Sequence, residues 1–144
     1  LTVRSRRTAS PPLNSSVRPQ SMTSLNRPLS NQESALVRWL LEHGKPEAAP
    51  FLQQLAQATV TPWKCQCGCA SINFVVQGKP EPSGGLNPLA DFLFGSDSDL
   101  SGIFVYEQAG VLAGLEVYGL AGEAPKALPS IGALRPWSDA AQSA

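Results

Sequence analysis

The stretch IFVYEQAGVLAGLEVY, residues 103–118, decides the fold. Two runs rich in β-branched, aromatic and leucine residues flank the short segment QAG at residues 108–110, which is typical of a β-hairpin. In the second run Leu115 and Val117 alternate with Glu116, so one face of the strand would be apolar and Glu116 would face water. The stretch predicts the clearest antiparallel strand pair in the chain.

The region before this hairpin predicts two helices. Ser30 and Glu33 have the spacing of a capping box, and apolar residues then recur at helical spacing, so a helix should cover residues 31–43. A second helix should cover residues 47–58, provided that Pro50 lies in its first turn. Two consecutive helices of this length would form an antiparallel helical hairpin.

Period-two alternation predicts two further strands, over residues 60–66 and 71–77, and an apolar segment at residues 88–94 predicts a short helix. The fold class is therefore α+β, with an N-terminal helical hairpin packed on an antiparallel sheet of about four strands. In the first helix Trp39 and Leu40 lie on the apolar stripe and should belong to the core.

The composition divides the 144 residues into three parts. Residues 1–31 are rich in Ser, Pro and Arg and hold five arginines and no acid, which predicts a disordered leader. That leader is either a transit peptide or sequence that precedes a native start at Met22. Residues 32–137 have room for a single domain, and residues 138–144 would form a disordered tail.

The charge balance limits the partners of this domain. Residues 32–137 hold six basic and ten acidic residues, and this mildly acidic balance argues against nucleic-acid binding, which needs clustered Lys and Arg. We therefore expect a protein or a small molecule as partner. No apolar run reaches the ~18 residues of a membrane span, and an odd number of cysteines indicates a reducing compartment, so we expect no membrane partner and a cytoplasmic location.

Three cysteines within five residues, Cys65, Cys67 and Cys69, carry most of the reactive chemistry. Zinc needs four ligands, usually from paired cysteines, so a zinc site here would have to recruit His43, the single histidine of the chain. A disulfide between two of the thiols is the redox alternative, helped by the flexibility of Gly68. A third interpretation treats the cysteines as small buried apolar residues beside a turn.

These features leave two functions open. One histidine, two tyrosines and scattered acids offer little for nucleophilic or general acid–base catalysis, so the chain is more typical of a non-enzymatic binding or interaction protein than of an enzyme. The alternative is a thiol protein that binds metal or switches its redox state at the three cysteines.

The chain resembles a group of small uncharacterised bacterial proteins. The resemblance rests on the two-helix start, the Cys-x-Cys-Gly-Cys-x-Ser-Ile segment at residues 65–72, the Gly-x-Leu-x-x-Leu-Glu strand at residues 110–116 and the Leu-Pro turn at residues 128–129. It covers roughly residues 35–137. It implies a bacterial cytosolic origin and carries no particular activity with it.

Overall fold

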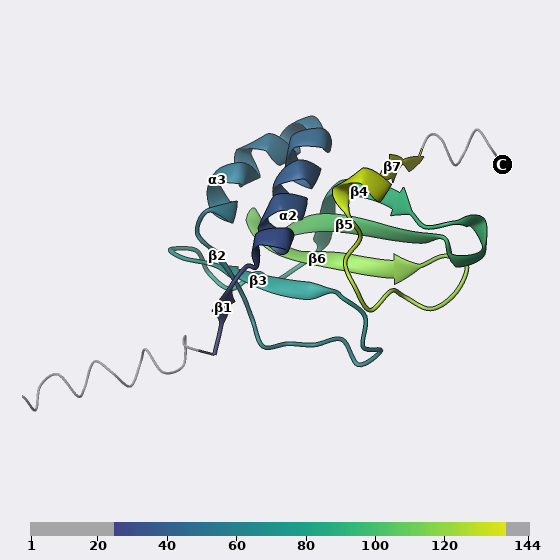
Figure 1. The fold of residues 1–144 in the computed structure, drawn as a ribbon. Coiled ribbons are helices and arrows are strands. Elements are labelled where there is room, and N and C mark those ends of the chain that lie inside the picture. The colour runs from purple at the N-terminus through teal and green to yellow at the C-terminus, as the bar shows by residue number, and fades with distance from the viewer. Residues whose placement is uncertain (1–24, 138–144) are drawn as a thin grey trace, which may run out of the picture.

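The computed structural model describes residues 25–137 and has the expected mixed α+β architecture, built mostly of sheet (Figure 1). Seven strands form one antiparallel sheet in the order β1-β2-β3-β6-β5-β4-β7. The strands are β1 (Arg27–Pro28), β2 (Ala58–Val60), β3 (Ile72–Val76), β4 (Leu86–Phe94), β5 (Ser101–Gln108), β6 (Val111–Gly119) and β7 (Arg135–Pro136). The predicted hairpin of residues 103–118 is confirmed as β5 and β6, which lie in the middle of the sheet.

Helix α2 (Asn31–His43) begins and ends as its sequence predicts. Ser30 Oγ accepts a hydrogen bond from the backbone N–H of Glu33 at 3.1 Å, and the Glu33 carboxylate accepts one from the Ser30 N–H at 2.8 Å. This reciprocal pair satisfies two backbone donors that the first turn of a helix leaves free. At the other end, Gly44 lies so close to β4 that a Cβ there would collide with Leu89 and Ala90, so the helix ends at a position that only glycine can fill.

The predicted helical hairpin is wrong in its second arm. Residues 46–58 form the 3₁₀ helix η2 (Pro46–Phe51), the single-turn helix α3 (Leu52–Leu55) and the start of β2. Pro46 opens η2 and Pro50 lies inside it. Proline has no N–H to donate and clashes with the preceding turn, so an α-helix cannot run through Pro50.

The sheet is also larger than the four strands predicted. Residues 88–94 belong to the nine-residue strand β4 rather than to a helix, and the two outer strands, each two residues long, have no detectable alternation. A bulge between Pro88 and Ala90 shifts the register of β4, which hides its period of two. Of the predicted strand at residues 60–66, only Val60 lies in β2.

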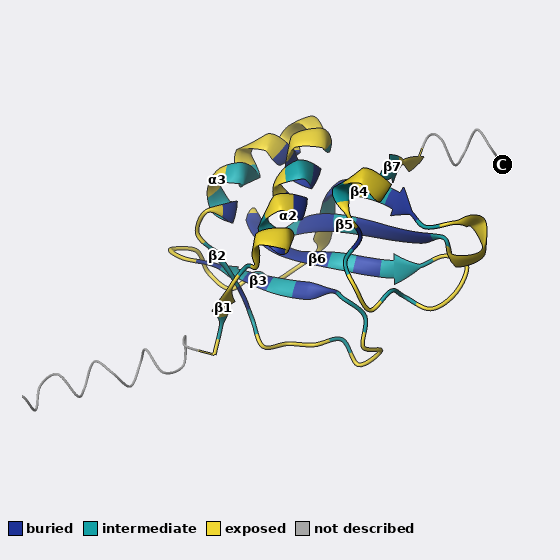
Figure 2. Ribbon diagram, in the orientation of Figure 1, coloured by how far each residue is buried: buried dark blue, intermediate teal, exposed yellow. Residues whose placement is uncertain are grey.

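The core lies between one face of the sheet and the helices. Figure 2 shows buried residues along the strands and on the side of α2 that faces them. Leu40 is fully buried, as predicted, and Trp39 is partly buried against the same core. The buried residues from α2 and the central strands include Leu36, Val37, Leu40, Leu41, Phe74, Ile103, Val105, Leu115 and Val117.

The described residues begin at residue 25, inside the predicted leader of residues 1–31. Arg27 and Pro28 pair with β2, and Arg27 forms a two-point ion pair with Glu33 of α2, both N–O distances being 2.9 Å. Residues 1–24 and the tail 138–144 lie outside the described residues. Within residues 25–137, no helix combines the length and apolar character needed to cross a membrane.

Candidate thiol site

The three cysteines lie on the connection between β2 and β3. A turn at Cys65 is closed by a hydrogen bond from the Gly68 N–H to the Cys65 carbonyl at 3.0 Å. Gly68 has a φ of 82°, in the left-handed region that residues with a Cβ rarely adopt. Glycine therefore allows the backbone to reverse between the second and third cysteines and brings all three side chains to one place.

The thiols form a compact group. The three Sγ atoms all lie within 4.8 Å of one another, and the Sγ atoms of Cys65 and Cys67 are 2.9 Å apart. The backbone N–H of Cys69 donates to Cys67 Sγ at 3.3 Å. Cys67 is exposed and the other two are partly exposed. The interpretation of these residues as buried apolar side chains is therefore wrong, because the turn holds them at the surface.

Ser71 anchors the site to the sheet and was not identified from the sequence. Its buried Oγ accepts the N–H of Val117 at 2.9 Å and lies 3.3 Å from the Val117 carbonyl. The Sγ of Cys69 lies 3.3 Å from the same Oγ, within hydrogen-bond distance of the thiolate that forms on deprotonation. The sequence signal for this role is a serine placed two residues after the last cysteine and immediately before an apolar strand.

The thiols differ in acidity. Hydrogen bonds with Cys65 and then with Cys69 raise the pKa of the Cys67 thiol to about 11. Desolvation raises the pKa of the Cys69 thiol, but its hydrogen bonds, led by those with Ser71, outweigh this effect and lower that pKa below its ordinary value. The group thus combines a thiol whose pKa is lowered with a thiol whose pKa is raised, so Cys69 loses its proton before Cys67.

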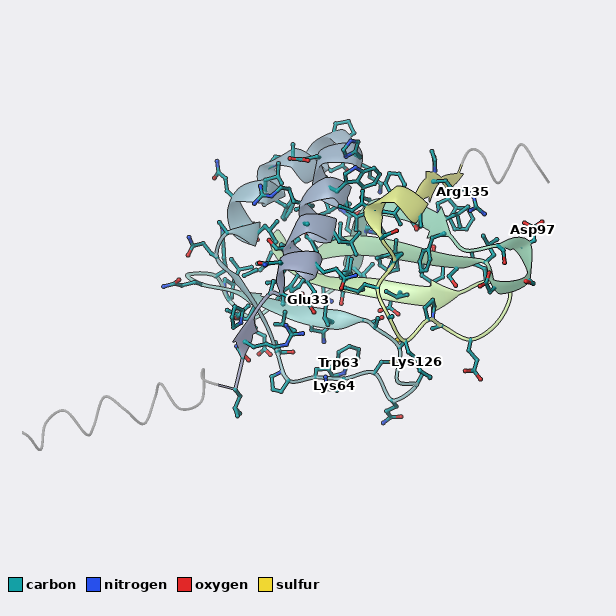
Figure 3. All side chains as sticks on the ribbon, in the orientation of Figure 1. Glu33, Trp63, Lys64, Asp97, Lys126 and Arg135 are labelled. Atoms are coloured by element: carbon teal, nitrogen blue, oxygen red, sulfur yellow. The ribbon has the colours of Figure 1, made fainter. Side chains whose placement is uncertain are left out.

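A pocket of about 270 Å³ adjoins the thiols. Figure 3 shows Trp63, Lys64 and Lys126 near one another on two loops below β3, and all three line this pocket. Lys126 donates to the Cys67 carbonyl at 3.3 Å, and the Ala70 N–H donates to the Pro125 carbonyl at 3.0 Å. These two contacts fasten the loop after β6 to the cysteine turn and place Lys126 beside thiols that become negative on deprotonation.

His43 lies apart from this group. It is the last residue of α2, its ring stacks on Trp39 at 4.1 Å, and its Nδ1 is 2.8 Å from the Trp39 carbonyl oxygen. Among the described residues, the group of His, Cys, Asp and Glu side chains with ligand atoms within 4.8 Å of one another contains the three cysteines alone. The structure brings together three of the four predicted ligands and leaves His43 on the helix.

No protein-family model, no curated protein and no solved structure matches this chain.

Proposed function

We propose that this chain is a binding protein that takes up one thiophilic metal ion, zinc in the first instance, through Cys65, Cys67 and Cys69. The observation that carries the proposal is the convergence of three Sγ atoms within 4.8 Å on a partly exposed turn. Thiolates are strong ligands for soft and borderline metal ions, and three on one turn require little further ordering of the chain.

The spacing of the sulfur atoms fits a three-thiolate site. A Zn–S bond of about 2.3 Å with tetrahedral angles places the sulfurs of a zinc site roughly 3.8 Å apart. The present group spans up to 4.8 Å, and the closest pair, Cys65 and Cys67, is 2.9 Å apart. Small rotations of exposed side chains would therefore suffice, because neither thiol is locked in a packed core.

The electrostatics support the same function. Three thiolates around a divalent ion leave a net charge of −1, and Lys64 and Lys126 line the adjoining pocket. The lowered pKa of Cys69 makes it the first of these two thiols to lose its proton, whereas the raised pKa of Cys67 makes its proton costly to remove. Because metal and proton compete for the same sulfur, affinity should rise steeply with pH.

The test is a titration of the reduced protein with Zn²⁺ against a chromophoric chelator, combined with native mass spectrometry. We expect one ion per chain. At free Zn²⁺ about 100-fold above the Kd, the ion should stabilise the fold by about 2.7 kcal/mol. Replacement of Cys69 with Ser should abolish binding, whereas His43→Asn should leave the affinity unchanged, because His43 lies outside the thiol group. Stoichiometric binding that survives the loss of Cys69 would contradict the proposal.

A redox switch is the second candidate, favoured by the 2.9 Å approach of Cys65 and Cys67. Oxidised glutathione would accept two electrons and two protons from these thiols, which leaves one disulfide in the protein and two molecules of reduced glutathione. Mass spectrometry after alkylation distinguishes this function. It predicts the reversible loss of two hydrogen atoms from the chain, with Cys69 still alkylated and the other two cysteines protected.

A further inference from the structure

The sheet face opposite the helices carries a cluster that is separate from the thiols, which we call the aromatic face: Phe104, Tyr106, Glu116 and Tyr118. Leu115 and Val117 of β6 point into the core. Side chains alternate along a strand, so Glu116 and Tyr118 point to the opposite face of the sheet. Phe104 lies 5.6 Å from Tyr106 and 5.9 Å from Tyr118, measured between ring centroids.

Two glycines let the tyrosine rings lie flat on the sheet. A Cβ at Gly102 would overlap the ring of Tyr118, and a Cβ at Gly114 would overlap the ring of Tyr106. Both glycines are the cross-strand partners of the tyrosines that cover them. Phe104 pairs with Glu116 between these two positions, so Glu116 lies on the same face of the sheet as the three rings.

The carboxylate of Glu116 lacks a partner within residues 25–137. Desolvation raises the pKa of Glu116, and no described side chain forms an ion pair with it. Glu116 in turn contributes to the raised pKa of Tyr106, after the larger effect of burial on that residue. A half-buried carboxylate in this setting gains from a cation that replaces the water it has lost.

The surrounding strands do not supply that cation. Strands β2 to β6 contain three carboxylates, Asp91, Glu107 and Glu116, and no Lys or Arg. Asp91 accepts hydrogen bonds from Tyr118 and Trp137, and Glu107 accepts them from Asn87 and the Gly110 N–H. Glu116 is therefore the carboxylate of this sheet that is left for a partner.

We propose that the aromatic face binds an arginine side chain of a partner protein, with the guanidinium paired to Glu116 and stacked against the partly exposed rings of Phe104 and Tyr118. Charge complementarity selects a cation. The rings favour arginine over lysine, because a guanidinium is planar, stacks on aromatic faces and pairs with a carboxylate through two parallel hydrogen bonds. This site is independent of the metal function proposed above.

The test uses the full chain, at low ionic strength, with the capped peptide Gly-Arg-Gly-Arg-Gly as the probe. Calorimetry should show saturable binding, and amide resonances of Phe104 and Glu116 should shift in NMR spectra. Glu116→Gln should weaken binding at least about tenfold, the effect of losing a charge-assisted hydrogen-bond pair. This variant should keep its fold, because glutamine replaces a charge that burial disfavours.

Matched controls make the result specific. Glu47→Gln removes an exposed charge from η2 on the helical side and should leave the affinity unchanged. The same peptide with citrulline in place of arginine should not bind. The proposal would be overturned if Glu116→Gln bound the arginine peptide as tightly as the unmutated chain does. It would also be overturned if the same peptide with lysine in place of arginine bound as tightly as the arginine peptide. Light scattering that shows a dimer lost in Glu116→Gln would overturn it in favour of a second copy of this chain.

Discussion

At the scale of single residues, Ser71 links the thiol turn to the sheet. Its one hydroxyl serves both Cys69 and the backbone of Val117. The contact explains how an exposed turn of three cysteines keeps a fixed position relative to β6. It also means that the chemistry of Cys69 and the stability of the strand depend on the same atom.

Ser71→Ala should therefore have two effects. The buried Val117 N–H loses its acceptor, which should lower the free energy of unfolding by about 1–3 kcal/mol. The Cys69 thiol loses its leading hydrogen-bond partner, so its pKa should rise, and the pH at which Cys69 becomes reactive toward iodoacetamide should rise with it. Ser130→Ala, at an exposed serine, is the control; if both variants titrate alike, Ser71 does not set the acidity of Cys69.

Ala109 is the residue with the least favourable backbone among those described. It has a φ of 52° in the two-residue turn between β5 and β6, and Gly110 follows with a φ of 82°. Such turns favour Asn-Gly, because asparagine tolerates left-handed backbone better than alanine. Ala109→Asn should stabilise the protein by about 0.5–1 kcal/mol in a urea titration, and Gly110→Ala should destabilise it by a similar amount. A loss of stability in Ala109→Asn would contradict this description of the turn.

At the scale of elements, α2 attaches to the sheet by its apolar stripe. Leu40 is fully buried, so Leu40→Ala removes buried surface and leaves a cavity, and it should cost about 2–5 kcal/mol of unfolding free energy. Arg38→Ala, on the exposed side of the same helix, should change stability by less than about 0.5 kcal/mol. Similar losses in both variants would mean that the helix does not present the Leu40 side to the sheet.

The ion pair between Arg27 and Glu33 joins β1 to α2 and should make stability depend on pH. The hydrogen bond from Arg27 lowers the pKa of Glu33 in the folded state. The contribution is therefore complete above the unfolded pKa of about 4.3 and is lost as the pH falls through the lower, folded value. Denaturant titrations between about pH 6 and pH 3 should show a smaller acid-dependent loss in Glu33→Gln than in the unmutated chain.

Glu47→Gln, which removes an exposed acid of η2, should retain that acid-dependent loss. If Glu33→Gln and the unmutated chain lose stability in parallel, the pair does not contribute to the pH dependence.

At the scale of the whole molecule, the sequence predicted the parts with a single dominant period. Helix α2, its cap and the β5–β6 hairpin follow from capping chemistry and alternation. Strand β4 could not be predicted in this way, because its bulge at Pro88 breaks the alternation. Leu93 obscures the alternation further, since it is fully buried although it lies outside the main core cluster. Strands β1 and β7 have two residues each, and their pairing depends on partners far away in the sequence.

The candidate site follows the same division. Proximity of the three cysteines was evident from their spacing, since five residues cannot hold them far apart. The roles of Ser71, Lys126 and the loop that carries Lys126 were not evident, because they arise from packing between segments more than forty residues apart. His43 was proposed as a ligand because it is the single histidine, and α2 directs it to Trp39 instead.

The outer strands of the sheet have a consequence for self-association. Both β1 and β7 consist of Arg-Pro. The part of the β4 edge that β7 does not cover contains Pro88, and there the Lys45 N–H donates a hydrogen bond to the Leu89 carbonyl at 2.9 Å. Proline has no N–H for a neighbouring strand, and the positive charge of Arg135 on β7 repels its copy in another molecule. Within residues 25–137, the sheet therefore offers little template for adding strands from other molecules, and concentrated samples should resist fibril growth seeded at these rims.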